Sequence, residues 1–224
     1  MLAAASGSSD RSREALARLC EAYWFPLYAF IRKQGSSPED AADLTQGYLV
    51  RLLDKSVLSQ VTPGAGRFRS FLFASVKHYL ANERDRDHAR KRGGGMSFVP
   101  LDTRDAEEKY AFEPSDDLTP ERVFERKWAT TVLERAMARL RADLTDGASQ
   151  RRFEILRPYL LGDESGGYRE AAAKLGVSDS AVAVAVHRLR KQFGVCLRDE
   201  ITDTVASPED VESEIRHLLG VLGG

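Results

Sequence analysis

The chain has 224 residues, of which 42% are hydrophobic and 30% are charged, as in an ordinary globular protein with room for one large or two small domains. Its formal net charge is −1, so it lacks the basic excess of proteins that bind duplex DNA unaided. Two cysteines make no disulfide framework and no apolar run is long enough to span a bilayer, so we expect a cytoplasmic protein without membrane insertion.

Helical spacing of apolar residues dominates the sequence, and strand-like alternation is scarce. Residues 1–12 have neither a basic start nor a long apolar segment, so we expect a disordered tail there rather than a signal peptide. An amphipathic helix follows, which Pro26 should kink or divide and Gly35 should end. A second helix is predicted from Ser37, because a capping residue, a proline and two acids follow one another there.

A third helix is predicted after the loop that ends at Gly66. Its apolar stripe runs from Phe68 to Leu80 and then stops. Over residues 81–92 the predicted helix has no core-facing side, so this part either projects into solvent or lies against something charged. Together these three helices form the first predicted domain, residues 13–93.

The segment 94–119 is predicted to be an acidic, loop-like linker between domains. It starts within a run of three glycines at positions 93–95. A glycine run can form a phosphate-binding loop, but no strand precedes this one and no Gly-Lys-Ser/Thr follows it, so we favour a flexible linker. The residues that follow open a second helical domain, 120–202, through the same capping pattern.

The segment 168–190 has the spacing of a helix-turn-helix. Ala172 would let two helices approach closely, and Gly176 would take the backbone conformation that costs a side chain most. Ser178 would cap the second helix, and Val182 would pack that helix back on the first. A second helix held in this way fits the DNA major groove, although an ordinary helical hairpin can show the same spacing.

Residues 203–224 are predicted to form a C-terminal helical extension. Apolar residues recur at helical spacing from Val211 to Leu222, and this face must be buried somewhere. It would pack on one of the two domains or on a regulatory protein. A cap over the core of the second domain is the alternative that we favour.

Over about residues 15–198, the order and spacing of these segments resemble bacterial RNA polymerase sigma factors of the extracytoplasmic-function group. Residues 39–46 are similar to the family's polymerase-docking segment, residues 68–72 to its promoter-melting segment, and residues 170–190 to its domain that reads the −35 element. The resemblance implies an all-α protein of two small helical domains. Its expected partners are promoter DNA and core RNA polymerase, at the β′ clamp and the β flap, with an anti-sigma or other regulatory protein as a further one.

The resemblance also assigns three sets of residues to these partners. The residues that would dock on the polymerase are Glu39, Asp40, Asp43, Leu44 and Gln46. The residues that would hold the −10 strand supply cations for its backbone and an aromatic surface for its unstacked bases. They are Arg67, Arg69, Phe71, Lys77, His78, Arg84, Arg86, Arg90, Lys91 and Arg92. The residues that would contact the −35 element are Arg169, Ser178, Asp179, Ser180, Ala183, His187, Arg188 and Arg190.

The predicted recognition helix departs from the family pattern in its middle. Residues 181–185 read AVAVA, where the family usually has basic residues. Few of these side chains can form hydrogen bonds with base edges, although Ala183 can contact a thymine methyl group. We therefore expect readout of the −35 element to depend on phosphate contacts and DNA shape. His78 is a second departure, since the family often has asparagine there.

Two alternatives to a sigma factor are kept. One is a helix-turn-helix regulator that acts without being a polymerase subunit. The other is a helical adaptor that binds no DNA, in which residues 168–190 only pack. For all three, the sequence contains no nucleophile–base pair, no clustered metal ligands and no nucleotide-binding loop, so we expect neither an enzyme nor a cofactor.

Overall fold

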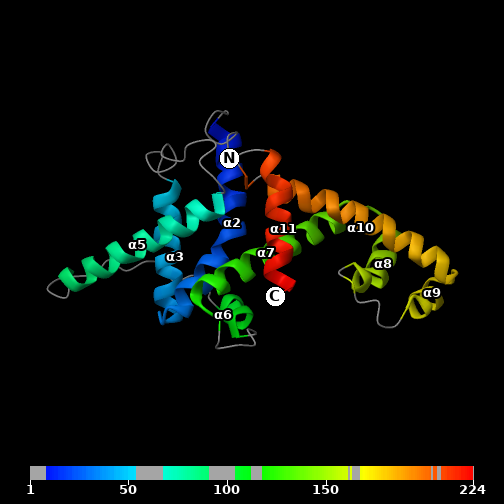
Figure 1. Ribbon diagram of the computed structural model, residues 1–224, viewed down its shortest axis with the longest axis horizontal. Helices are drawn as coiled ribbons and strands as arrows, with labels where there is room; N and C mark the ends of the chain where they lie inside the picture. The colour runs from blue at the N-terminus through cyan, green and yellow to red at the C-terminus, as the bar shows by residue number, and fades with distance from the viewer. Residues whose placement is uncertain are drawn as a thin grey trace. The chain divides into compact units, whose positions relative to one another are not determined.

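The computed structural model (Figure 1) describes residues 9–53, 68–90, 104–111, 118–160, 162, 167–202, 204–205 and 208–223. All regular structure in these ranges is helical and none is strand, which confirms the predicted all-α class. None of the helices in these ranges has both the length and the apolar character that crossing a membrane requires.

The chain divides into two compact units that share two long helices. The first unit comprises Met1–Thr131 and Ile201–Gly224, and the second comprises Val132–Glu200. The unit boundaries lie inside α7 (Pro120–Ala142) and near the end of α10 (Asp179–Thr202). The first half of α7 and the C-terminal residues therefore belong with the N-terminal helices, whereas the sequence alone suggested a boundary at residue 120.

Helices α2 (Ser9–Lys33), α3 (Pro38–Leu53) and α5 (Phe68–Arg90) form the frame of the first unit. Helix α2 continues through Pro26 and is not divided there. Helices α2 and α3 pack side by side. The core that α2, α3, α5 and α7 enclose is mostly aliphatic and aromatic, and includes Tyr23, Leu27, Phe30, Leu52, Leu72, Val76, Phe124 and Trp128.

Helix α3 begins as the sequence predicts. Ser37 Oγ accepts a hydrogen bond from the Asp40 amide at 3.1 Å, so the hydroxyl satisfies one of the free donors at the helix start. The buried side of the helix contains Tyr48, whose hydroxyl donates to the Leu72 carbonyl oxygen at 3.1 Å and ties α3 to α5. Burial raises the pKa of Tyr48 to about 12, so this donor keeps its proton at physiological pH.

The predicted linker contains a helix that the sequence analysis did not anticipate. Helix α6 (Arg104–Ala111) lies within the acidic segment and is joined to α2 by Glu107. The Glu107 carboxylate accepts hydrogen bonds from Arg32 Nε at 2.7 Å and Arg32 Nη2 at 3.0 Å, and a further one from the Tyr28 hydroxyl. The expectation of a loop is therefore wrong over these eight residues, because a forked arginine–carboxylate pair attaches them to the first unit.

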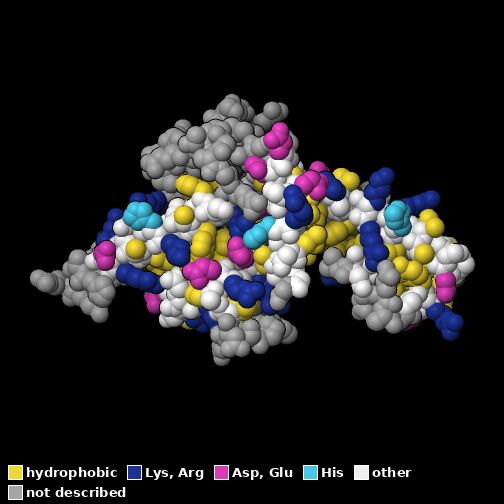
Figure 2. Space-filling view, in the orientation of Figure 1, with side chains coloured by type: hydrophobic (Ala, Val, Ile, Leu, Met, Phe, Trp, Pro, Cys, Tyr) yellow, Lys and Arg dark blue, Asp and Glu magenta, His cyan; other side chains and the backbone are white. Residues whose placement is uncertain are grey.

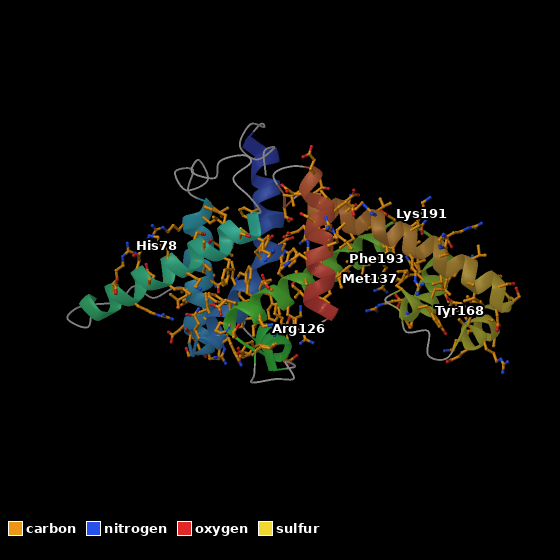
Figure 3. All side chains as sticks on the ribbon, in the orientation of Figure 1. His78, Arg126, Met137, Tyr168, Lys191 and Phe193 are labelled. Atoms are coloured by element: carbon orange, nitrogen blue, oxygen red, sulfur yellow. The ribbon has the colours of Figure 1, made fainter. Side chains whose placement is uncertain are left out.

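The second unit consists of the end of α7, α8 (Gly147–Leu156), the 3-10 turn η1 (Arg157–Tyr159), α9 (Arg169–Leu175) and most of α10. Figure 3 shows Met137 of α7 and Phe193 of α10 where these two helices run together. Two ion pairs flank this contact: Arg135 with Glu200 at 3.0 Å, and Arg139 with Asp199 at 3.2 Å.

The C-terminal extension forms a short 3-10 turn, η2 (Pro208–Asp210), and α11 (Val211–Gly223). Its buried residues are Val211, Glu214 and Leu218, whereas Leu219 is exposed. The helix belongs to the first unit. The favoured expectation of a cap over the second domain is therefore wrong. In that unit Val211 and Leu218 are buried, and the buried Glu214 carboxylate accepts a hydrogen bond from Arg69 of α5.

Candidate nucleic-acid interface

The turn between α9 and α10 has the geometry of a helix-turn-helix. Gly176 ends α9 with φ 66° and ψ 34°, a left-handed conformation that favours glycine. Its amide and that of Val177 both donate to the Ala172 carbonyl oxygen, which closes the turn. Ala172 and Val182 are buried, so the small residue and the aliphatic residue occupy the positions that the sequence predicts.

Ser178 begins the second helix of this motif. Its side-chain oxygen accepts a hydrogen bond from the Ala181 amide at 3.2 Å, and its carbonyl oxygen accepts one from the Val182 amide at 3.1 Å. The predicted cap is thus confirmed. Because Ser178 Oγ also lies 2.9 Å from Ser180 Oγ, both hydroxyls at the start of α10 take part in local hydrogen bonds.

One side of α10 is exposed and positively charged. Its exposed side chains are those of Ser180, Val184, His187, Arg188, Lys191, Gln192, Val195 and Arg198. No acidic residue occurs between Ser180 and Arg198, and the acidic residues of the helix, Asp179, Asp199 and Glu200, lie at its two ends. Figure 2 shows the lysine and arginine side chains gathered along this helix with a histidine among them. We call these eight residues the α10 face.

Lys191 was missed by the sequence reasoning, which stopped at Arg190. Figure 3 shows its side chain on the outer side of α10, away from the packed helices. It follows Arg188 by three residues and Val184 by seven, which places all three on one side of a helix. This helical spacing is the sequence feature from which Lys191 could have been predicted.

The structure gives Arg190 a different role from the predicted DNA contact. Its Nε and Nη2 atoms donate to the Tyr159 carbonyl oxygen at 3.2 and 2.7 Å, so the half-buried guanidinium ties η1 to α10. The other residues predicted to contact the −35 element are more accessible. Arg169 and Asp179 are exposed, and Ala183 is half-buried.

Arg69 does not occupy a position where it can reach DNA. Only 6% of the residue is exposed, and its guanidinium pairs with Glu214 at 2.9 Å and Glu125 at 2.8 Å. It also lies 4.8 Å from the ring centre of Trp128. The predicted −10 contact of Arg69 is therefore wrong in this structure, because two carboxylates and an aromatic ring already enclose the cation.

Farther along α5, the predicted −10 residues lie at the surface. Lys77 is exposed and pairs with Glu121 at 3.1 Å, while its ammonium group lies 5.1 Å from the Phe73 ring centre. His78 is exposed, as Figure 3 shows, and lies 3.1 Å from the Asn82 amide nitrogen. Exposed pairs of this kind are weak, so a nucleic acid can displace them.

Two further arginines on α5 have neighbours on the same surface. Arg84 donates to Gln34 at 2.7 Å, and Arg86 pairs with Glu83 one turn earlier at 2.5 Å. Phe71 is half-buried and lies 6.1 Å from the Phe68 ring centre. The remaining predicted −10 residues, namely Arg67, Lys91, Arg92 and the side chain of Arg90, lie outside the described residues.

The predicted polymerase-docking residues share the outer side of α3. Glu39 and Asp43 are exposed, whereas Leu44 and Gln46 are half-buried. Asp40 is also exposed, although its carboxylate receives a hydrogen bond from the Ser37 hydroxyl at 2.9 Å.

The same side of α3 continues in two exposed apolar side chains that the sequence analysis did not single out. Val50 is 69% exposed, and Leu53 is 40% exposed. They follow Asp43 by seven and ten residues, so they lie on the same side of α3, nearer its C-terminal end. We call Glu39, Asp43, Val50 and Leu53 the α3 stripe. It presents two carboxylates followed by an apolar end.

The described residues contain no cluster suited to a metal. No group of three histidine, cysteine or acidic side chains occurs among them in a position to hold an ion. A hollow of about 340 Å³ does lie between α7 and α11, lined by Leu118, Arg122, Glu125, Arg126, His217, Gly220 and Val221. A Cβ atom on Gly220 would meet nothing within 4 Å, so the missing side chain contributes to this space.

Comparison of the chain with protein-family models, with curated proteins and with solved structures gave no match. The functional assignment therefore depends on the sequence pattern and on the geometry of the two helical units.

Proposed function

We propose that this chain is a sigma factor that binds core RNA polymerase and directs promoter recognition and DNA opening. The observation that carries the proposal is the helix-turn-helix turn at Gly176, whose second helix presents the cationic α10 face to solvent. A helix of this kind can enter the major groove, where lysine and arginine neutralise phosphates. The order of the sequence segments supports the same proposal.

The α3 stripe supports the second half of the proposal, a large protein partner. Exposed carboxylates beside exposed apolar residues suit a partner surface that is basic at one end and apolar at the other. The near-zero net charge of the chain points the same way, because an unaided DNA-binding protein usually carries a basic excess. The polymerase would supply that missing affinity.

Reconstitution with purified core polymerase tests the proposal. Wild-type protein with core enzyme should give transcripts with defined start sites, and either component alone should give none. The protein without polymerase should bind promoter DNA weakly. A helix-turn-helix regulator would instead bind its operator tightly without core enzyme, and an adaptor would bind neither DNA nor polymerase. Either result would contradict the proposal.

Two pairs of charge reversals separate the two surfaces. Arg188→Glu with Lys191→Glu should weaken promoter binding by the holoenzyme and leave polymerase binding intact, because both side chains lie on the α10 face. The matched control is Arg151→Glu with Arg152→Glu, two exposed arginines on α8 with the same change of charge.

Charge reversal on α3 should affect polymerase binding first. Glu39→Lys with Asp43→Lys should reduce binding to core polymerase, because the partner surface would then meet like charge. Asp105→Lys with Glu108→Lys, at two exposed positions of α6, is the control. Equal losses with the α3 pair and the α6 pair would show that only net charge matters and would contradict docking through the α3 stripe.

A further inference from the structure

The C-terminal helix inserts a charged residue into the first unit. Glu214 of α11 is 1% exposed, and its Oε1 atom accepts a hydrogen bond from Arg69 Nε at 2.9 Å. The two residues are 145 positions apart in the sequence. Arg69 is the second residue of α5, so this contact joins the last helix of the chain to the first turn of α5.

Two residues of α7 complete the surroundings of Arg69. Glu125 accepts a second hydrogen bond from its guanidinium at 2.8 Å, and the Trp128 ring lies beneath it, with 4.8 Å from the guanidinium carbon to the ring centre. We call Arg69, Glu125, Trp128 and Glu214 the Arg69 cluster. It connects α5, α7 and α11 through a single cation.

Two further side chains of the first unit lie against this cluster. Tyr23 of α2 is fully buried, and its pKa is raised, first by burial and then by the nearby Glu214 carboxylate. His217, one turn after Glu214, lies 6.1 Å from the Trp128 ring centre and 3.4 Å from the Glu125 carboxylate. Arg69, Trp128 and Glu214 are therefore buried within the unit, whereas Glu125 is partly exposed.

Removing Glu214 would leave a buried cation with part of its charge uncompensated. Breaking a buried ion pair from one side costs far more than the intact pair contributes, because the remaining charge stays out of water. Arg69 would relieve that cost by moving toward solvent, and the first turn of α5 would move with it. The residues proposed to bind the −10 strand follow on the same helix, from Phe71 to Arg86.

We propose that Glu214 is a positioning residue for promoter opening. The C-terminal helix anchors the first turn of α5 through Arg69 and thereby sets the position of the DNA-binding surface of that helix. This inference rests on the proposed sigma-factor function. It assigns α11 to the opening step, separate from polymerase docking by the α3 stripe and from −35 binding by the α10 face.

The physical link is tested first, in the free full-length protein. Glu214→Leu and Arg69→Met should each lower the thermal midpoint by roughly 10 °C. The double variant should recover much of that loss, because it leaves no fully buried charge unpaired, and Glu125, the other partner of Arg69, is 35% exposed. Additive losses in the double variant would show that the two residues do not act as a pair and would overturn the inference.

The functional link is tested with Glu214→Gln, which keeps the shape of the side chain and removes its charge. Below the thermal midpoint of the variant, its affinity for core polymerase should equal that of the wild type. Transcription from a duplex promoter should fall by about tenfold or more. Transcription from the same promoter with an artificially unpaired −10 region should match the wild type, because the opening step is bypassed.

Glu212→Gln is the matched control, since Glu212 is an exposed carboxylate on the same helix. It should behave as the wild type on both templates. If Glu214→Gln lowers transcription equally on duplex and unpaired templates, or on neither, the positioning role is wrong. If wild-type protein itself gives no transcription with core polymerase, the proposed function fails, and the stability measurements above still decide whether the two charges form a pair.

Discussion

Single residues decide how the first unit holds its parts together. Glu107 attaches α6 to α2 through Arg32 and Tyr28, and its pKa is lowered from 4.5, first by the hydrogen bond from Arg32. A carboxyl group whose pKa is lower in the folded state stabilises that state above the unfolded pKa. The stabilisation is lost as the pH falls through the folded pKa, which lies below 4.5. Acid should therefore weaken the contact between α6 and α2.

This expectation can be measured by amide hydrogen exchange. Amides of α6 should exchange more slowly at pH 6 than at pH 3, after correction for intrinsic rates, and Glu107→Gln should remove most of that difference. Glu108→Gln, at an exposed position of the same helix, should retain the pH dependence. Unchanged behaviour of the Glu107 variant would rule out this carboxylate as the titrating group.

Substituting alanine at two glycines should change the free energy of unfolding in opposite directions. Gly176 has φ 66°, so Gly176→Ala should lower the free energy of unfolding by about 1–2 kcal/mol. Gly220 lies within α11, and a Cβ atom there meets nothing within 4 Å, so Gly220→Ala should raise the free energy of unfolding by about 0.5–1 kcal/mol. Denaturant unfolding measures both. A loss at Gly220 would mean that the hollow beside it does not admit a methyl group.

At the scale of the element, α10 has one side packed in the core and another exposed to solvent. Val182, Val186, Leu189 and Phe193 are buried along one side of it, and the α10 face lies on another. The alanine and valine run at its centre therefore supplies packing and leaves few polar side chains to read bases. In the proposed function, the cations toward its middle and end would contact phosphates, which fix position without specifying sequence.

Lys191 provides a quantitative test of that interpretation. Lys191→Gln should weaken binding of the reconstituted holoenzyme to different promoters by a similar factor and reduce the slope of log affinity against log salt by about 1, as expected for loss of one phosphate contact. Gln192→Ala is the neighbouring control without a change of charge. A selective loss at one promoter sequence would instead indicate that Lys191 contacts a base.

At the scale of the whole molecule, the last helix belongs to the first unit although the whole second unit precedes it in sequence. Deleting the residues after Thr204 removes Glu214 and Leu218 from the first unit, both of which are almost fully buried there. We expect the truncated protein to lose protection of α5 amides in hydrogen exchange, while amides of the turn at Gly176 keep theirs. Unchanged protection of α5 would show that α11 contributes little to the unit.

Features that depend on neighbouring residues could be predicted from the amino-acid pattern. The cap at Ser37, the helix-turn-helix turn at Gly176 and the all-α class were predicted correctly, because capping and backbone conformation are set within a few positions of the chain. Apolar periodicity likewise located much of the buried side of the long helices. The polymerase and DNA contacts remain predictions.

Which charged side chains are exposed depends on the packing of the helices. A sequence pattern treats Arg69 and Lys77 alike, since both are cations in a basic and aromatic run, yet one is buried against Glu214 and the other is exposed. Glu107 was assigned to a linker, and Glu214 stood among the charged residues of the tail. Each has a partner on another helix far away in the sequence, and such pairing depends on three-dimensional proximity, which local spacing does not encode.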